Sequence, residues 1–285
     1  MDLSKPIDGI VDFRITNKCN YRCEYCVEKK HLVNPETLKD ASDKVINAFI
    51  EFLRTRNSRW NVGLIGGEPT IHPRFLEVVK EVINLNHSFY LVTNFSRSID
   101  FYKEVVDITG DNLEHLYASL HMTQVKSVDD FIEKADKFNK YKNPKTKFVV
   151  LSILRDENFD FLLETKERLE KRGIQVFLHL NVFKGKEMNY SEKVKKYIEE
   201  NIQKINPTGI LTKKTFGTIC HTGYKGCTID EFGTVTRCYG VQELYYFGNI
   251  VDGNYKLFNE PMPCLAQTCN CSLFASTGMV KFDQV

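Results

Sequence analysis

The sequence predicts an α/β fold in which a parallel sheet curls into a partial (β/α)6 TIM-type barrel, followed by a small cysteine-rich C-terminal domain of β-hairpins and loops. Strand-like and helix-like hydrophobic periods alternate six times between residues 10 and 182. The connections are short, so each strand can return to the same sheet through a crossover helix. Six of the nine cysteines follow residue 206. An open, doubly wound parallel sheet is the alternative arrangement.

The expected strands are short apolar runs that end in glycine or polar residues. They cover residues 10–16, 62–65, 89–93, 113–121, 148–154 and 174–182. Apolar residues at helical spacing predict the crossover helices. The first helix opens at Asn34, Pro35 and Glu36, an N-cap followed by proline at the first helical position, and continues to Phe52. Further helices are expected over 73–85, 99–108, 128–141 and 159–172.

The chain changes character near residue 185. A charged helix is expected over 191–205, and an Asn-Pro-Thr-Gly turn follows it. Beyond this turn the chain is short-stranded, with a β-hairpin expected across 230–233. We therefore expect a domain boundary near 206–215, with a barrel domain over 1–206 and a cysteine-rich domain over 207–285.

Composition and charge exclude several classes of protein. The net charge is +2, from 39 basic and 37 acidic residues, which gives no reason to expect polymeric nucleic acid as a partner. Residues 1–12 carry no basic segment followed by an apolar run, and no apolar run approaches about 18 residues, so we expect neither a signal peptide nor a membrane span. The expected location is the reducing cytoplasm, where nine cysteines indicate metal or thiol chemistry.

Three cysteines lie close together directly after the first expected strand. Cys19, Cys23 and Cys26 follow the spacing C-x3-C-x2-C. Soft thiolates at this spacing suit zinc or an iron–sulfur cluster. A structural zinc site normally closes with four ligands, and no fourth cysteine lies nearby in the sequence. Three thiolates on a [4Fe–4S] cluster leave one iron with an open coordination position, so a cluster is favoured over zinc or coincidence.

The segment from Phe13 to Cys26, including Tyr25 before the third cysteine, resembles the signature of the radical S-adenosylmethionine (radical SAM) superfamily. A second motif follows the second expected strand and resembles the turn that contacts the methionyl amine of S-adenosylmethionine in that family. Its residues are Gly66, Gly67, Glu68, Pro69 and Thr70. Glycines allow close backbone approach to a ligand, and carbonyls with a carboxylate suit an ammonium group. The resemblance covers residues 8 to about 185.

Polar residues end the third and fourth expected strands. They are Thr93, Asn94, Ser119 and His121. The resemblance implies that they contact the nucleoside or carboxylate of S-adenosylmethionine. All of these candidates follow carboxyl ends of strands, which form the catalytic face of α/β barrels. Two alternatives stay open: Asn94 caps the following helix, and His121 is a hydrogen-bonded histidine at a strand end.

The resemblance also implies the cofactors and the chemistry. A [4Fe–4S] cluster binds the amine and carboxylate of S-adenosylmethionine at its open iron. An electron from the reduced cluster, supplied by a flavodoxin- or ferredoxin-type donor, then releases a 5′-deoxyadenosyl radical that abstracts hydrogen from the substrate. The cofactor performs the difficult step, and the protein positions and shields it.

The C-terminal cysteines resemble the opening half of SPASM/Twitch extensions, which bind auxiliary [4Fe–4S] clusters. The resemblance rests on the spacing of Cys220, Gly233 and Cys238. A full SPASM extension has seven cysteines, including a C-x2-C-x5-C-x3-C stretch that this chain lacks, so a Twitch-like single cluster is expected. Cys220 and Cys238 are the firmest ligands. The other two come from Cys227, Cys264, Cys269 and Cys271, with Cys264 and Cys269 favoured by position.

One or two tail thiols then remain unligated, with Cys227 and Cys271 the candidates. The resemblance implies that such a thiol donates hydrogen back to a substrate radical. The alternative is a cysteine buried as a small apolar residue. A zinc site in the tail, in place of a cluster, is a further alternative.

Together these features predict a radical SAM enzyme with one auxiliary cluster that acts on a peptide or small polar molecule. The expected reaction is peptide modification, epimerisation or alcohol oxidation. The barrel is expected to begin by residue 10, which leaves no room for a separate N-terminal peptide-recognition domain and favours a compact or partner-delivered substrate. The alternatives are a radical SAM enzyme acting on a nucleoside or nucleic acid, and a non-catalytic iron–sulfur or zinc protein.

Overall fold

The computed structural model describes most of the chain. The described residues are 7–26, 35–183, 186–187, 189–205, 214–239, 245–267 and 269. Three sequence-based expectations fall outside these ranges: the N-cap at Asn34, the ligand or free thiol at Cys271, and residues 206–213 of the expected domain boundary. They stay predictions.

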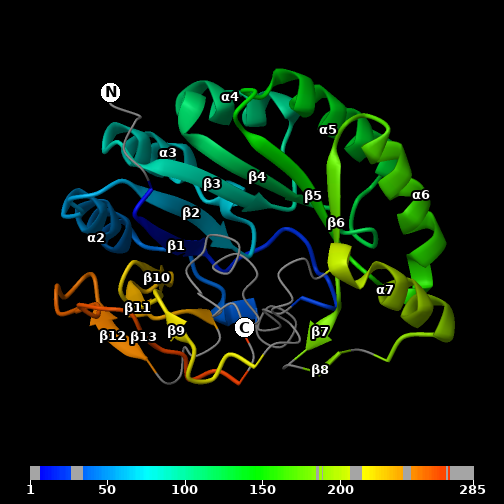
Figure 1. The fold of residues 1–285 in the computed structure, drawn as a ribbon. Helices are drawn as coiled ribbons and strands as arrows, with labels where there is room; N and C mark the ends of the chain where they lie inside the picture. The colour runs from blue at the N-terminus through cyan, green and yellow to red at the C-terminus, as the bar shows by residue number, and fades with distance from the viewer. Residues whose placement is uncertain are drawn as a thin grey trace.

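A nine-stranded, mostly parallel sheet forms the centre of the molecule (Figure 1). Its first six strands are β1 (Gly9–Thr16), β2 (Trp60–Gly66), β3 (Ser88–Thr93), β4 (Leu113–Ser119), β5 (Lys147–Ile153) and β6 (Gln175–His179). Each pairs in parallel with the next strand in chain order. Parallel neighbours require crossover connections, and helices supply them here. The predicted α/β fold with six βα steps is therefore confirmed.

Three strands of the tail extend this sheet beyond β1. They are β10 (Gly226–Ile229), β11 (Thr234–Thr236) and β12 (Tyr246–Asn249), and the order at this edge is β12-β11-β10-β1. Strand β10 runs parallel to β1 and antiparallel to β11, which confirms the hairpin expected across 230–233. The hairpin turn fits its sequence: Asp230 accepts hydrogen bonds from two backbone N–H groups, and Gly233 adopts a φ of 84° that favours glycine. The two-domain division stays a prediction.

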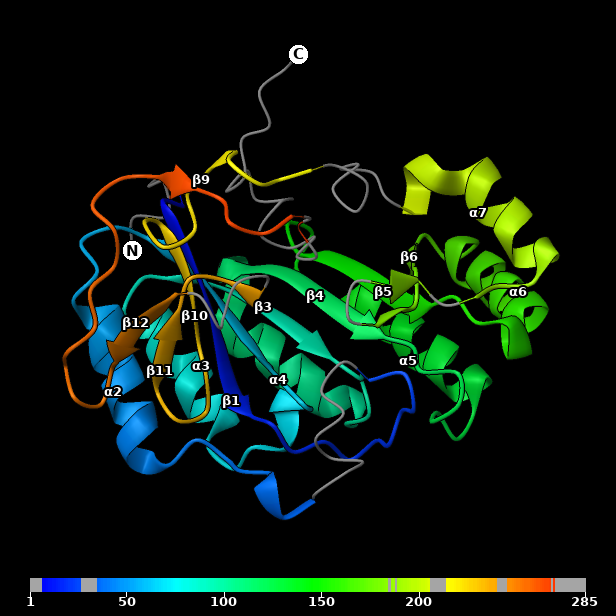
Figure 2. The same cartoon turned by 90° about the horizontal axis from the view of Figure 1, so that it is seen from below.

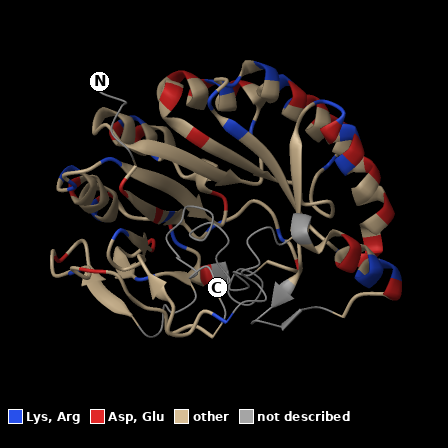
Figure 3. Cartoon of the chain, viewed as in Figure 1, with Lys and Arg blue, Asp and Glu red and all other residues tan. Residues whose placement is uncertain are grey.

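The α-helices cover one face of the sheet. They are α2 (Asp43–Arg54), α3 (Phe75–Asn84), α4 (Ile99–Thr109), α5 (Val128–Tyr141), α6 (Phe159–Glu170) and α7 (Glu192–Ile205). Figures 1 and 2 show α2 to α6 as an arc along the outside of the curved sheet, with the tail strands at the β1 end. In Figure 3, lysine, arginine, aspartate and glutamate gather on these helices with both signs interspersed. Among the described residues, no helix is long and apolar enough to cross a membrane.

Short elements complete the described chain. They are the 3-10 turns η1 (Pro35–Thr37), η2 (Pro69–Ile71), η3 (Gly110–Asn112) and η4 (Asp156–Asn158), and the strand pairs β7 (Val182–Phe183) with β8 (Lys186–Glu187) and β9 (Ile219–Cys220) with β13 (Met262–Pro263). The expected strand 174–182 is therefore divided, because the regular pairing of β6 with β5 ends at His179.

Alternation along β1 separates the two faces of the sheet. Val11, Phe13 and Ile15 are fully buried on the outer face, in the main apolar core with the helices, and the Phe13 and Phe49 rings lie 4.1 Å apart. We call the opposite side, which these helices do not cover, the inner face. A smaller buried cluster lies there, formed by Ile10 and Tyr90 with Val92, Tyr117 and Cys238 packed against it.

The first helix begins later than the sequence predicts. Pro35 starts only one 3-10 turn, and the chain then runs extended beside β1, where Asp40 forms a bridge with Thr16. Helix α2 begins at Asp43 because Ser42 is the N-cap and accepts a hydrogen bond from the backbone of Val45. The prediction of an N-terminus near Pro35 was wrong because pairing with β1 competes with the local helix signal.

Candidate functional site

The predicted site residues follow the carboxyl ends of four neighbouring parallel strands. The cysteine segment, residues 17–26, follows β1, and the turn Gly66–Thr70 follows β2. Thr93 and Asn94 lie at the end of β3. Ser119 ends β4 with a half-buried side chain, and His121 follows it. Because parallel strands place their carboxyl ends at one edge, the fold gathers these segments there.

Backbone contacts hold the cysteine segment against the turn after β2. Gly67 N donates to Thr16 O at 2.9 Å, and Glu68 N donates to Lys18 O at 2.8 Å. A Cβ on Gly66 would lie 2.1 Å from Thr16 O, and a Cβ on Gly67 would lie 2.2 Å from Lys18 O. Both positions therefore require glycine because the end of β1 packs on Gly66 and the start of the cysteine segment packs on Gly67. The sequence had predicted that these glycines admit a ligand, and the close approach to the protein backbone adds a structural reason.

Glu68 is fully buried and organises the ends of β2 and β3. Its Oε1 accepts hydrogen bonds from the Thr70 backbone at 3.1 Å and from the Thr70 hydroxyl at 2.6 Å. The Thr93 hydroxyl donates to the same oxygen at 2.7 Å, and Asn94 N donates to Oε2 at 2.6 Å. Burial raises the pKa of this carboxyl, while these hydrogen bonds oppose the rise. The carboxylate therefore positions the site through its protein contacts.

Replacing Glu68 with glutamine should lower the free energy of unfolding by about 2–3 kcal/mol, because the amide turns one acceptor into a donor that faces buried donors. Urea unfolding measures this change. The matched control is Glu104→Gln on the exposed face of α4, which should alter stability by less than about 0.5 kcal/mol. Equal stability of the two variants would contradict the organising role of Glu68.

Asn94 connects the end of β3 to the cysteine segment. Its Nδ2 donates to Asn20 Oδ1 at 2.8 Å and lies 3.8 Å from Cys19 Sγ. Its Oδ1 accepts from Ser96 N at 3.0 Å. The alternative that Asn94 caps the next helix is wrong, because Ser98 is the N-cap of α4. Asn94 instead contacts the segment that carries the first cysteine.

His121 and Tyr25 meet above β4. Tyr25 Oη lies 3.0 Å from His121 Nδ1, and the two rings stack with centroids 5.8 Å apart. Burial lowers the pKa of His121 to about 4, so the imidazole is neutral at pH 7. The Arg155 guanidinium lies over the Tyr25 ring, 5.0 Å from the ring centroid. His121 is thus a hydrogen-bonded histidine that fixes the aromatic residue before the third cysteine.

The three thiols of the cysteine segment lie partly or fully buried. Cys23 is 6% exposed, and Tyr21 N donates to Cys19 Sγ at 3.3 Å. Burial raises the pKa of the Cys19 thiol and raises the pKa of Cys23 to about 11. A bound metal ion deprotonates such thiols outright, so this donor set fits a positively charged iron site. No three histidine, cysteine or acidic side chains converge on a single-ion site within the described part of the chain.

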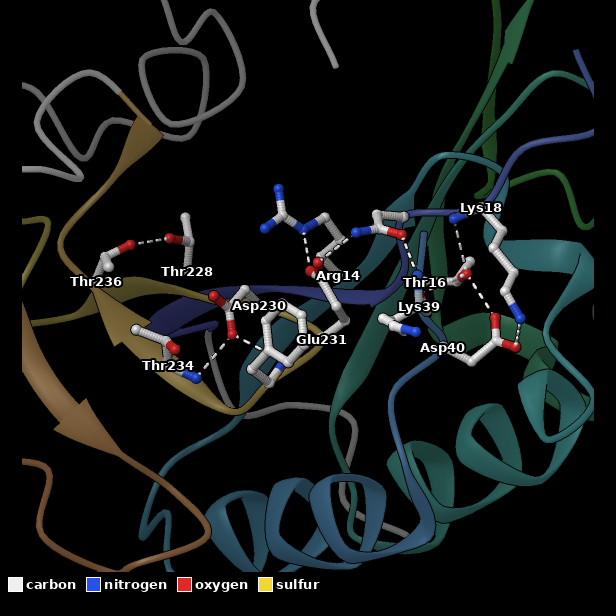
Figure 4. Close-up of polar contacts among 12 residues, drawn as sticks. Arg14, Thr16, Lys18, Lys39, Asp40, Thr228, Asp230, Glu231, Thr234 and Thr236 are labelled. Carbon is white, nitrogen blue, oxygen red and sulfur yellow. Dashed lines mark hydrogen bonds and ion pairs between the residues drawn. The ribbon is translucent and has the colours of Figure 1, made fainter. Parts of the chain in front are cut away.

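Polar contacts brace the chain where β1 enters the cysteine segment (Figure 4). The buried carboxylate of Glu231, from the β10–β11 turn, accepts from Arg14 Nε at 2.5 Å and from Asn17 Nδ2 at 2.6 Å. On the other side, Asp40 accepts from the Thr16 hydroxyl at 2.7 Å and from Lys18 Nζ at 2.6 Å. Sequence analysis missed Glu231, because a partner 217 residues away leaves no local signal.

The tail cysteines occupy three different environments. Cys220 and Cys264 are buried together where β9 pairs with β13, and Cys269 packs partly buried against them. Cys238 packs on the inner face of the main sheet. Cys227 lies in β10 within the main apolar core on the outer face, where burial raises the pKa of its thiol to about 12. The structure thus brings together three of the expected auxiliary ligands and places Cys227 among apolar side chains.

Comparison with known proteins identifies a family. The sequence matches the family model of the Radical SAM superfamily over residues 13–198, about two thirds of the chain. The chain is similar to the radical SAM cyclopropyl synthase TigE of Paramaledivibacter caminithermalis, with 24% identity over 286 residues. That alignment covers 84% of this chain and 58% of the synthase, so the chain spans less than two thirds of that relative's length.

Solved structures share the fold. SuiB of Streptococcus suis bound to S-adenosylmethionine aligns with a TM-score of 0.59 and 14% identity, covering 86% of this chain and 64% of that one. BtrN in complex with AdoMet and 2-DOIA aligns with a TM-score of 0.53 and 12% identity, covering 88% of this chain and 81% of that one. At these identities the similarity concerns the fold alone.

Proposed function

The chain belongs to the radical SAM superfamily, and on this premise we propose that it cleaves S-adenosylmethionine reductively and abstracts hydrogen from a peptide or small polar substrate. One observation carries the proposal. The segment with Cys19, Cys23 and Cys26 is fixed against the turn at Gly66–Thr70 by backbone hydrogen bonds that only glycines permit. Thiol ligands and a cofactor-binding turn are thereby held as one rigid unit at the catalytic edge of the sheet.

Each element of this unit has a proposed task. Cys19, Cys23 and Cys26 ligate a [4Fe–4S] cluster, which supplies the one-electron cleavage of S-adenosylmethionine when bound. The turn at Gly66–Thr70 holds the amino group of S-adenosylmethionine through backbone carbonyls, because the carboxylate of Glu68 is already hydrogen-bonded within the protein. A flavodoxin- or ferredoxin-type protein supplies the electron, and we expect the enzyme in the cytoplasm.

The test of this function uses the whole chain after anaerobic cluster reconstitution and reduction. Incubation with S-adenosylmethionine should yield 5′-deoxyadenosine, measured by liquid chromatography and mass spectrometry. A protein that carries the cluster and binds S-adenosylmethionine but forms no 5′-deoxyadenosine would instead be a non-catalytic iron–sulfur protein.

The substrate class is proposed from the relatives together with the composition. One similar protein is a cyclopropyl synthase, SuiB has been solved with the precursor peptide SuiA, and BtrN with 2-DOIA. A GTP 3′,8-cyclase of Haemophilus influenzae is 27% identical over 57% of this chain, which keeps a nucleoside-type substrate as the second candidate. The net charge of +2 favours neither a DNA nor an RNA polymer.

An auxiliary cluster in the tail is supported by the environment of Arg237. This side chain is 1% exposed, and its hydrogen bonds to the described residues go to backbone carbonyls, including those of Thr222 at 2.9 Å and Met262 at 2.6 Å. A further bond reaches Cys220 O at 3.5 Å. A buried cation without a carboxylate partner is unfavourable unless an anionic group lies near it. A cluster with four thiolate ligands is such a group, and Arg237 bonds to the backbone beside two candidate ligands, since Cys220 ends β9 and Cys264 directly follows β13.

Replacing Arg237 with glutamine should remove the auxiliary cluster. The change removes the buried positive charge and the hydrogen bonds by which Arg237 connects β9 and β13. Reconstituted protein should then bind about four irons per chain in place of about eight, measured by iron and sulfide analysis. Arg54→Gln serves as the control, since this arginine is exposed on α2 and pairs only with Glu51 at the surface. About eight irons in the Arg237 variant would contradict the proposed role.

A further inference from the structure

One row of residues crosses the inner face of the sheet at the level of Asp12. Asp12 in β1 pairs in register with Gly63 in β2, and Gly63 pairs with Tyr90 in β3. On the other side, Asp12 pairs with Thr228 in β10. Residues paired in register point to the same face of a sheet, so Asp12 and Tyr90 lie on the inner face, separated by a glycine.

Gly63 gives Tyr90 the space to lie across β2 toward Asp12. A Cβ on Gly63 would lie 2.1 Å from Tyr90 Cζ and 2.3 Å from the Tyr90 hydroxyl oxygen. The tyrosine ring therefore covers the glycine, and its hydroxyl is directed toward β1. The structure thus places a phenol and a carboxyl group near one another on neighbouring sides of a residue without a side chain.

Both polar groups are buried. Asp12 and Tyr90 are each 1% exposed, and the Tyr90 hydroxyl bonds to no described residue. The Tyr239 side chain lies close enough to Asp12 to lower its pKa by hydrogen bonding, but no hydrogen bond of ordinary length and angle reaches either carboxyl oxygen from the described residues. Their row is otherwise satisfied, since the Thr228 and Thr236 hydroxyls lie 2.6 Å apart. Buried polar groups without partners are rare in folded proteins and mark sites that an ordered water or a ligand completes.

Among the described residues, no basic side chain forms an ion pair with Asp12. Arg14, on the same strand and face, is paired with Glu231. His115 in β4 is neutral, because burial lowers its pKa to about 4. Burial raises the pKa of Asp12 to about 7, and the Tyr239 side chain from the tail partly offsets that rise. Within the part of the chain that the structure describes, Asp12 is thus a buried acid without a positively charged partner.

We propose that Asp12 and Tyr90 form a binding site for a positively charged nitrogen, an ammonium group of the substrate, on the inner face of the sheet. The assignment to the substrate rests on the proposed function. A neutral hydrogen-bonding group would leave a buried carboxylate uncompensated, whereas an ammonium ion pairs with it and also interacts with aromatic faces. Tyr117 and Cys238 pack beside Tyr90 on this face and are only partly buried.

The test compares two small probes that differ in charge. Cyclohexylammonium and its uncharged analogue cyclohexanol are titrated into the intact, cluster-loaded protein at pH 7.5 by isothermal calorimetry. The ammonium probe should bind at least tenfold more tightly than cyclohexanol. Equal affinities for the two probes would overturn the proposal. Absence of binding by either probe would also overturn it, and is the result expected if a buried water alone completes the site.

Variants locate the binding. Asp12→Asn should weaken cyclohexylammonium binding at least tenfold and leave cyclohexanol unaffected, while Tyr90→Phe should weaken it about threefold. Gly63→Ala displaces the Tyr90 ring without removing either polar group and should also weaken it. The control Asp252→Asn, in an exposed turn, should change nothing. Unchanged affinity in the Asp12 and Gly63 variants would overturn the proposal, whereas failure of the wild-type chain to form 5′-deoxyadenosine would overturn only the proposed function.

Discussion

Replacing Cys19, Cys23 and Cys26 together with alanine should abolish formation of 5′-deoxyadenosine, a loss of more than about a thousandfold. In the proposed function these thiolates would hold the cluster that supplies the electron for cleavage of S-adenosylmethionine, so their loss would remove that chemistry. The loss should not arise from misfolding. The cysteine segment contributes little to the apolar core, and the backbone bonds that Gly67 and Glu68 donate to Thr16 and Lys18 are independent of the thiols.

Iron analysis of the same variant separates the two proposed clusters. If the tail holds an auxiliary cluster, the triple variant should keep about four irons per chain, all of them in the tail. The Arg237→Gln protein should lose these tail irons and keep the cluster at Cys19, Cys23 and Cys26. Circular dichroism should show unchanged secondary structure. Cleavage of S-adenosylmethionine at a wild-type rate would refute the proposed role of Cys19, Cys23 and Cys26. Iron near zero with zinc present would refute the auxiliary cluster and favour a zinc site in the tail.

The order of strands and helices could be predicted because each element carries its own periodic pattern. Helix α5, for example, has the predicted bounds, Val128–Tyr141, since Ser127 caps it and its apolar residues keep helical spacing. The start of α2 could not be predicted. A proline at the first helical position competes there with pairing between Thr16 and Asp40, which depends on a strand more than twenty residues earlier.

The candidate site could be predicted in part. Motif spacing after strand ends located the cysteine segment and the turn at Gly66–Thr70, because both are local features. The task of each side chain is a three-dimensional property. The position of Glu68 in the motif does not reveal whether its carboxylate binds a ligand. The structure shows that it accepts hydrogen bonds at the ends of β2 and β3. Glu231 lies in an ordinary hairpin turn, and only the fold brings it to Arg14.

Cysteines show the same limit. Cys227 and Cys220 lie seven residues apart in one short-stranded segment, and the sequence alone does not distinguish their environments. Strand β10 turns Cys227 into the apolar core, while β9 places Cys220 beside Cys264. Asp12 carries no signal in the sequence, because a single acidic residue inside an apolar strand does not by itself indicate a functional site. Its burial without an ion-pair partner among the described residues is visible only in the structure.

Replacing Asp12 with asparagine should stabilise the protein, and the gain should grow with pH. The carboxyl has a pKa of about 7 in the folded protein because of burial, against about 3.9 when unfolded. Between these values the folded state holds a proton that the unfolded state has released, so wild-type stability falls as the pH rises. The full penalty above pH 7 is about 4 kcal/mol, and at pH 5 it is about 1.5 kcal/mol. The asparagine variant avoids both.

Urea unfolding of the two proteins at pH 5 and pH 8 measures this difference. The advantage of the variant should increase by about 2–3 kcal/mol between the two pH values, and Asp252→Asn should show no such trend. A difference that does not change with pH would mean that Asp12 is ionised and compensated in the folded protein. A carboxyl that lowers stability at neutral pH fits the trade-off between stability and function that functional sites often show. Cyclohexylammonium should reduce the advantage of the variant, because it binds the protein that has the acid more tightly and so stabilises it more.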